Sequence, residues 1–288
     1  NCASLFPGMT TQPSDPTPPL VLVFAASDPT GGAGIQADIM TMSGMGCHAL
    51  TVITALTVQD TVGVEDVLPV DAEFVAEQAR AVLEDMPVQA FKLGVLGSVE
   101  NIAVIAEIIS DYPHIPVIVD PVIASGRGDE LASEAMLATL RELIIPQATV
   151  ITPNTMEARR LVARSGDDFD ECSMSECAAR LLAMGCEYVL ITGSHAHTPQ
   201  VVNTLYGPAG VLRADTWARL QGSYHGSGCT LASAVAAAMA HGLDISAAAY
   251  EAQGFTWQTL ATAFRPGMGQ HIPNRFFWAR SPGDTSGA

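Results

Sequence analysis

The chain has 288 residues, long enough for one or two domains, and 48% of them are hydrophobic, as in a compact globular protein. It carries 30 acidic and 13 basic residues, for a formal net charge of −17. This balance argues against nucleic acid or an anionic membrane as the main partner. An anionic substrate would instead be bound by backbone N–H groups, a metal ion or a few arginines.

The composition also excludes particular sites. The only lysine is Lys92, which precedes Leu93, whereas a P-loop needs a lysine followed by Ser or Thr. The six cysteines form neither a disulfide framework nor a zinc motif, which favours a reducing, cytoplasmic location. His195 and His197 have no third metal ligand near them in sequence, so we expect ordinary loop histidines. No apolar run has the length and character of a membrane span.

The first strand is expected at residues 19–26, a continuous apolar run typical of a strand buried on both faces of a parallel sheet. Residues 1–18 are rich in Pro, Ser and Thr and lack periodicity, so we expect a flexible tail there and a second one at 281–288. A glycine-rich turn follows the first strand and leads into a helical pattern that ends near Gly46.

Strand and helix patterns alternate along the rest of the chain. Further strands are expected at 48–54, 89–93, 116–120, 148–152, 187–192 and 201–206. Further helices are expected at 72–85, 99–111, 131–144, 155–164, 173–185, 228–241 and 244–263. This alternation, without an internal linker, predicts a single α/β domain over 19–280, with a doubly wound, mostly parallel sheet flanked by helices.

Ligands of such sheets bind beyond the carboxyl ends of the strands, so the residues that follow each apolar run are predicted to converge on one edge. These segments are 27–32, 57–60, 94–96, 120–122, 152–154 and 192–195.

A loop of small residues precedes the Ala-rich helix expected at 228–241 and ends in Gly226, Ser227, Gly228 and Cys229. The first N–H groups of a helix are unpaired, and the helix dipole is positive there, so this loop suits an anion such as a transferring phosphoryl group. A helix N-terminus also lowers the pKa of a thiol, so Cys229 is predicted to be partly thiolate and able to accept a proton. The alternative is a buried helix start with Cys229 as a small core residue.

Three oxygen-bearing side chains follow predicted strands. Asp120 and Glu157 can supply ligands to Mg²⁺, which phosphoryl transfer requires, and Asn154 precedes Glu157 by three residues. Each has a structural alternative, since Asn154 is a favoured helix cap and Glu157 a favoured acid in a first helical turn. It is their joint occurrence with the Gly226–Cys229 loop that favours a kinase.

Two further patterns remain open. Gly32-x-Gly34-x-x-Ala37 fits a loose dinucleotide fingerprint, with Asp60 as the candidate ribose-binding acid, so a nicotinamide-dependent oxidoreductase is an alternative. The side-chain amide of Gln59 offers a donor and an acceptor in one plane, which suits the edge of an aminopyrimidine or pyridine ring. The alternative for Gln59 is a surface glutamine.

Six segments of the chain resemble the hydroxymethylpyrimidine/phosphomethylpyrimidine kinases of the thiamine pathway, members of the ribokinase-like superfamily. The segments are 26–38, 52–59, 92–96, 119–122, 151–157 and 225–229. The resemblance implies a fold without a separate lid domain, usually as a homodimer. It also implies transfer from Mg-ATP to the 5-hydroxymethyl group of 4-amino-5-hydroxymethyl-2-methylpyrimidine, and then to the monophosphate. A pyridoxal or related vitamin kinase, or a non-catalytic pyrimidine-binding sensor of the same fold, remains an alternative.

The resemblance further implies roles for individual residues. Substrate contacts are implied for Gln59, which grips the ring, and for Ala26, Asp28, Ala33, Val95 and Val122. The anion hole corresponds to Gly226, Ser227, Gly228 and Cys229, with Cys229 as the general base. Contacts with ATP are implied for Asn154, Glu157, Thr192, Gly193 and Asp120, and contacts with Mg²⁺ for Asp120 and Glu157.

Overall fold

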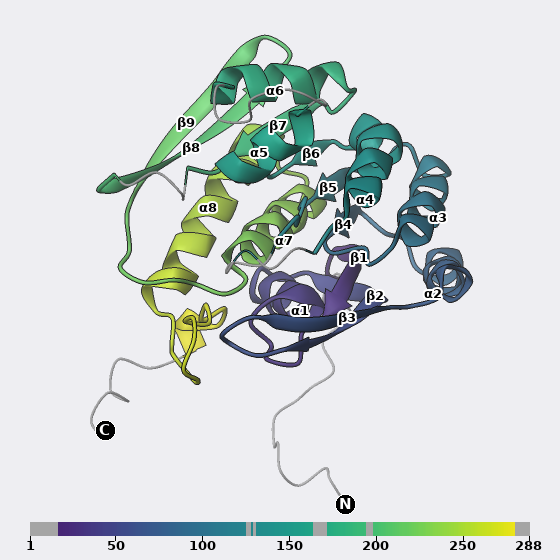
Figure 1. The fold of residues 1–288 in the computed structure, drawn as a ribbon, viewed down its shortest axis with the longest axis horizontal. Coiled ribbons are helices and arrows are strands. Elements are labelled where there is room, and N and C mark those ends of the chain that lie inside the picture. The colour runs from purple at the N-terminus through teal and green to yellow at the C-terminus, as the bar shows by residue number, and fades with distance from the viewer. Residues whose placement is uncertain (1–16, 125–127, 129–130, 164–171, 194–197, 280–288) are drawn as a thin grey trace, which may run out of the picture.

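The computed structural model describes residues 17–124, 128, 131–163, 172–193 and 198–279 (Figure 1). The loop histidines His195 and His197, most of the predicted N-terminal tail and the whole of the C-terminal one lie outside these residues. None of the helices within the described ranges is long and apolar enough to cross a membrane.

Within the described residues, nine strands form one sheet in the order β3-β2-β1-β4-β5-β6-β7-β8-β9. The strands are β1 Leu20–Ser27, β2 His48–Gln59, β3 Val64–Pro69, β4 Ala90–Leu93, β5 Val117–Val119, β6 Val150–Ile151, β7 Tyr188–Ile191, β8 Gln200–Gly207 and β9 Gly210–Ala218. Neighbouring strands pair in parallel through the centre of the sheet, in the order β2-β1-β4-β5-β6-β7. The pairing is antiparallel at the two edges, for β3 on one side and for β8 and β9 on the other. The predicted α/β class with a mostly parallel sheet is therefore confirmed.

Helices cover both faces of the sheet (Figure 1). They are α1 Gly34–Gly44, α2 Ala72–Asp85, α3 Val99–Ser110, α4 Glu134–Thr139, α5 Thr155–Val162, α6 Met174–Ala183, α7 Ser227–Ala240 and α8 Ile245–Ala261. One hydrophobic cluster joins α1, α7 and α8 to one face, and a second joins α2 to α6 to the other. The helix expected at 131–144 begins later, at Glu134, and its α-helical part ends at Thr139. The next turn, Leu140–Ile144, is π-helical.

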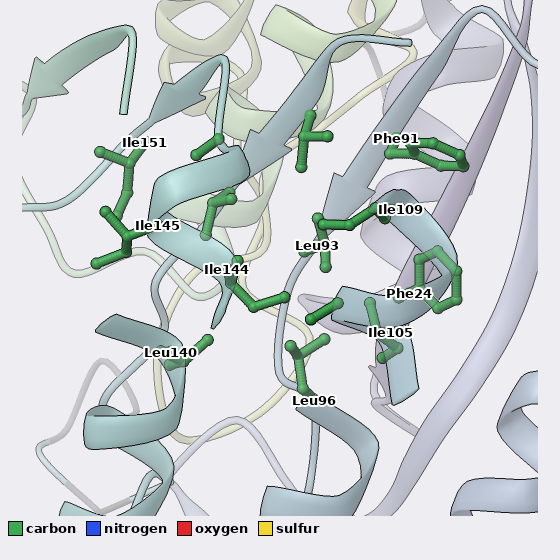
Figure 2. Packing of buried hydrophobic residues seen from close by; sticks show 14 of the residues in the cluster. Phe24, Phe91, Leu93, Leu96, Ile105, Ile109, Leu140, Ile144, Ile145 and Ile151 are labelled. Atoms are coloured by element: carbon green, nitrogen blue, oxygen red, sulfur yellow. The ribbon is translucent and has the colours of Figure 1, made fainter. Parts of the chain in front are cut away.

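Alternate residues of β1 enter the two clusters, as the apolar run at 19–26 predicts. Val21 and Val23 pack toward α1, α7 and α8, whereas Phe24 packs on the other face with Phe91 of β4 and Ile105 of α3. Figure 2 shows this second cluster, in which the rings of Phe24 and Phe91 lie near Ile105 and Ile109. Burial on both faces fixes the central strands, and with them the positions of their carboxyl ends.

Two strands, β3 and β9, were not expected from the sequence. Both lie at sheet edges, where one side of the strand pairs with no other described strand and side chains such as Glu65 and Leu212 face solvent. An edge strand needs no continuous apolar run, so the pattern that identifies β1 is missing there. In addition, β2 extends past residue 54 to Gln59, because residues 55–59 pair with the unexpected edge strand β3.

Candidate active site

A cavity of about 420 Å³ lies at the carboxyl edge of the parallel strands. The strand-end segments predicted to converge all contribute to its wall, from Asp28 after β1 to Thr192 after β7. The predicted site residues that line it are Ala26, Asp28, Ala33, Gln59, Val95, Asp120, Val122, Asn154, Glu157, Thr192, Gly226, Ser227, Gly228 and Cys229. The exception is Gly193, whose N–H donates to Asn203 and whose Cα packs so closely on the Val202 carbonyl that a Cβ would overlap it.

The start of α7 opens onto this cavity. Gly226 caps the helix with φ of +76°, a conformation that favours glycine, and a Cβ there would overlap the carbonyl of Gly32. The loop after β1 and the loop before α7 therefore meet through their backbones. A Cβ on Gly228 would lie 3.7 Å from Oδ1 of Asp120, which shows how near the carboxylate is to the helix start.

The prediction that Cys229 has a lowered pKa is wrong. Burial raises the pKa of the Cys229 thiol well above its usual value, and the nearby charge of Asp120 raises it further. Lys92 acts in the opposite direction without compensating. Sequence reasoning considered the helix dipole alone, whereas desolvation beside a carboxylate outweighs it here. Cys229 therefore rests as a thiol, in the first turn of α7 and in the wall of the cavity.

A buried lysine lies behind the thiol. Lys92 is 0% exposed, and its Nζ lies 2.9 Å from Oδ1 of Asp38 and 3.9 Å from Oδ2 of Asp120. Ser233 of α7 donates a hydrogen bond of 2.6 Å to the same oxygen of Asp38, and Lys92 also donates to Oδ2 at 3.0 Å. Burial alone would lower the pKa of Lys92, but Asp38 and Asp120 hold it above its usual value, so the amine stays protonated. The partner of Lys92, Asp38, is 54 residues away, so no local sequence pattern connects the two residues.

Asp120 and Glu157 fit a magnesium site. No hydrogen-bond partner among the described residues reaches the buried Oδ2 of Asp120, and burial raises the pKa of this carboxyl although Lys92 opposes it. The pKa of Glu157 rises to about 8, first through burial and then through the charge of Asp120. A cation between them would relieve both effects. No group of three His, Cys, Asp or Glu ligands occurs among the described residues, so water and phosphate oxygens would complete the shell.

Asn154 and Glu157 also have the structural role that the sequence left open. Oδ1 of Asn154 accepts hydrogen bonds from the N–H groups of Met156 and Glu157, and Oε2 of Glu157 accepts one from the N–H of Asn154, each at 2.9 Å. This capping box starts α5 and holds the Glu157 carboxylate at the cavity wall. Thr192 forms a parallel bridge with Asn154, which joins the end of β7 to the same cap.

A polar cluster that the sequence did not predict adjoins Gln59. Nε2 of His225 lies 2.8 Å from Oδ2 of Asp28 and 2.9 Å from the amide of Gln59. Gln59 therefore lies in the cavity wall with defined partners and is not a free surface glutamine. His225 stands in the segment that carries the resemblance, but nothing in the sequence shows that it reaches Asp28, 197 residues earlier.

Among the described residues, Arg275 is the largest fully buried side chain, and it connects the loop after β1 to the start of α7. It is 2% exposed, and its guanidinium donates to the carbonyl of Gly32 at 2.6 Å and to Oγ1 of Thr230 at 3.1 Å. Burial lowers its pKa to about 10, so the group stays charged beneath the start of α7. No sequence pattern marked this residue, which lies beyond the last predicted helix.

The dinucleotide fingerprint has another explanation. Gly34 begins α1, and a Cβ there would overlap the carbonyl of Ala26, so the glycine serves the packing of the loop on β1. The proposed ribose-binding acid, Asp60, accepts hydrogen bonds from the N–H groups of Val62 and Gly63 in its own turn. Asp60 is not among the cavity residues, so nothing in this geometry supports the oxidoreductase alternative.

Backbone N–H groups at the start of α7 can hold a transferring phosphoryl group, and the adjacent carboxylates can hold the cation that such a transfer needs. At the carboxyl edge of a parallel sheet, and without a P-loop, this chemistry defines a small-molecule kinase. The chain belongs to the phosphomethylpyrimidine kinase family, whose model matches residues 28–274.

Individual proteins agree with the family. A hydroxymethylpyrimidine/phosphomethylpyrimidine kinase of Mycobacterium tuberculosis is 40% identical over 259 residues, which cover 89% of this chain and 94% of the relative. The phosphomethylpyrimidine kinase structure from Clostridium difficile 630 has a TM-score of 0.70 at 33% identity, covering 83% of this chain and 97% of the other.

A pyridoxal kinase from Staphylococcus aureus, solved with AMP-PCP and pyridoxal, has a TM-score of 0.82 at 26% identity and covers 92% of this chain and 96% of its own. The expected ribokinase-like fold and family are thus confirmed, and the chain is a phosphotransferase.

Proposed function

We propose that this chain transfers the γ-phosphoryl group of Mg-ATP to the 5-hydroxymethyl group of 4-amino-5-hydroxymethyl-2-methylpyrimidine, and then to its monophosphate, in cytoplasmic thiamine biosynthesis. The observation that carries the proposal is a single cavity that joins the amide of Gln59 to the helix start at Cys229. A ring held by Gln59 would place its hydroxymethyl group toward a site suited to phosphoryl transfer. The names of the relatives support the same substrates.

Different residues would bind the metal ion, the transferring phosphoryl group and the nucleotide. Asp120 and Glu157 would hold Mg²⁺, which neutralises charge on the phosphates when it is bound. The N–H groups at Gly228 and Cys229 would donate to the oxygens of the transferring group, on which negative charge is spread. Asn154 and Thr192, which line the same cavity, would contact the nucleotide. Gly193 stands behind this wall and would act only by shaping it.

Cys229 is the proposed acceptor of the hydroxyl proton. Because its pKa is raised, only a small fraction is thiolate near neutral pH, and the fraction grows as pH rises. We therefore expect kcat to increase with pH across the neutral and mildly alkaline range. Replacing the thiol would remove the acceptor while leaving the carboxylates and the amides of the loop in place.

The test is ADP release in a coupled assay with Mg-ATP and either the pyrimidine, its monophosphate or pyridoxal. Turnover on both pyrimidines is the expected result, and turnover on pyridoxal alone would assign the chain to the other vitamin kinases. Cys229→Ala should lower kcat by roughly 10²- to 10⁴-fold with little change in ATP binding. Cys47→Ala is the matched control, because Cys47 packs against the Ala237 carbonyl away from the cavity wall. Near-normal turnover by Cys229→Ala would contradict the assigned role.

A homodimer is part of the proposal, supported by an exposed apolar face on β2 and β3. Leu56 and Leu68 are paired across the two strands and are 48% and 64% exposed, and Val58 beside them is 56% exposed. Such a patch marks an interaction surface. A dimer in sedimentation equilibrium that Leu68→Glu converts to monomer is the expected result. A monomeric wild-type chain would contradict the dimer without affecting the proposed chemistry.

A further inference from the structure

The polar cluster beside the cavity contains one contact that needs a chemical explanation. Nε2 of His225 lies 2.8 Å from Oδ2 of Asp28 and 2.9 Å from Nε2 of Gln59. An imidazole nitrogen has either one proton or one lone pair in the ring plane, so it cannot donate to a carboxylate and accept from an amide N–H together. Either the carboxyl group of Asp28 must carry a proton, or the amide of Gln59 must turn its oxygen toward Nε2 of His225.

Asp28 determines the state of His225. Its carboxylate accepts hydrogen bonds from the N–H groups of Thr30 and Ala33 and from the hydroxyl of Thr30, at 2.7–2.9 Å. Burial raises the pKa of Asp28, but hydrogen bonds from His225 and the two backbone groups outweigh it and leave the pKa below its usual value. Asp28 is thus ionised and can only accept, so Nε2 of His225 carries a proton and donates.

The group of Gln59 that faces His225 must then be an acceptor. A half-turn of the terminal amide exchanges Oε1 and Nε2 at almost no change in shape. It brings Oε1 to the position 2.9 Å from Nε2 of His225, whose proton is then shared between two oxygens. After the half-turn, the N–H of His225 faces the amide oxygen of Gln59 and no longer its N–H groups.

Thr57 leads to the same orientation independently. Its hydroxyl lies 2.9 Å from the carbonyl of Ser27, which can only accept, so the single proton of Thr57 is used there. The other end of the Gln59 amide lies 3.1 Å from the same hydroxyl oxygen. That oxygen now has only lone pairs to offer, so the amide end beside it must be Nε2.

We propose that Asp28, His225 and Thr57 are positioning residues for substrate specificity, which hold Gln59 with Oε1 toward His225 and Nε2 toward Thr57. The inference rests on the proposed function, in which Gln59 binds the ring of the substrate. One lone pair of Oε1 and one N–H of Nε2 remain for that ring, and their order along the pocket wall is fixed. The pocket then selects rings by the order of donor and acceptor on one edge, as well as by shape.

The selection separates two rings of nearly equal size. The 4-aminopyrimidine has an amino donor beside a ring-nitrogen acceptor, which matches Oε1 and Nε2 in this order. The corresponding 4-pyrimidinone has a carbonyl acceptor beside a ring N–H donor, which is the reverse order. Binding it requires the amide to turn over, and this breaks the contacts of Gln59 with both His225 and Thr57.

The experiment measures the dissociation constants of the 4-amino and the 4-oxo ring by titration calorimetry without nucleotide, and then kcat/KM for both rings with Mg-ATP. The wild-type chain should prefer the amino ring in both measurements. Thr57→Val removes one of the two contacts that fix the amide, so the preference should fall about 2- to 10-fold, the worth of one neutral hydrogen bond. Asp28→Asn permits the other tautomer of His225 and should lower the preference as well.

The controls separate positioning from general damage. Thr57→Ser keeps the hydroxyl and should retain the wild-type preference, and so should Thr139→Val, because Thr139 is a half-buried residue of α4 outside the cavity wall. In Thr57→Val the loss should appear in KM for the amino ring, with kcat and KM for ATP nearly unchanged.

Turnover of the pyrimidine with an unaltered preference in Thr57→Val and Asp28→Asn would overturn the inference but not the proposed function. A preference that falls as expected without any turnover would overturn the function alone. Failure of both rings to bind would overturn both.

Discussion

The buried cation Lys92 supports the sharpest prediction about stability, made with the variant Lys92→Met. Methionine keeps the length of the side chain but leaves Asp38 and Asp120 without the charge between them. Lys92 and Asp38 are both 0% exposed, and the side chain of Asp120 is 5% exposed, so water cannot replace the lost partner. Removing one member of such a buried pair typically costs about 3–5 kcal/mol. For a chain of this size that corresponds to a fall of about 6–20 °C in Tm.

The loss should depend on pH in a defined direction. Burial raises the pKa of Asp120 in the folded chain, while Lys92 opposes this rise. Without Lys92 the folded state binds still more protons than the unfolded state, so its stability falls as pH increases above the unfolded value of about 3.9. The difference in unfolding free energy between wild type and variant should therefore be smaller at pH 5 than at pH 8.

Urea unfolding of the two proteins at both pH values is the assay, followed by intrinsic fluorescence. The double variant Lys92→Met, Asp38→Asn is the control. Neutralising one of the two unpaired carboxylates should recover part of the lost unfolding free energy. A loss below about 1 kcal/mol, or one that is the same at pH 5 and pH 8, would refute the reasoning from the buried charges.

Two further predictions concern the carboxylates and the loop. Because the pKa of Glu157 is about 8 and only the ionised form binds a cation, the apparent Mg²⁺ dissociation constant should fall about tenfold from pH 7 to pH 9. Glu157→Gln should abolish this slope in a metal titration, and a slope that persists would assign the titration to another group. Gly226→Ala should destabilise the chain by more than Gly242→Ala, because both have positive φ but only Gly226 has a carbonyl in the way. Equal shifts in the urea midpoint would show that the two loops do not need their close contact.

The parts of the fold that sequence could predict are those fixed by local patterns. The run at 19–26 predicts a strand buried on both faces, and the glycines before residue 229 predict the helix start that opens onto the cavity. The edge strands β3 and β9 carry no such pattern, because solvent accepts many residue types on an unpaired edge.

The candidate site shows the same division. Asp120, Glu157 and Gln59 follow predicted strands and meet where strand ends must meet. The pKa of Cys229 could not be predicted, because it depends on burial and on a carboxylate from another strand. The pairs Lys92–Asp38 and His225–Asp28 join residues far apart in sequence, and no spacing rule connects them.

Arg275 has a consequence for how the site matures during synthesis. Its guanidinium donates to the carbonyl of Gly32, 243 residues earlier in the chain. The loop after β1 therefore cannot form this contact until Arg275 has been synthesised. Contacts of such long range form late, since a long segment must first be ordered. A nascent chain that has completed β1 to β7 already has its central strands, but it lacks both the Gly226–Cys229 loop and Arg275. Ligand binding would thus distinguish finished chains from incomplete ones more sharply than secondary structure does.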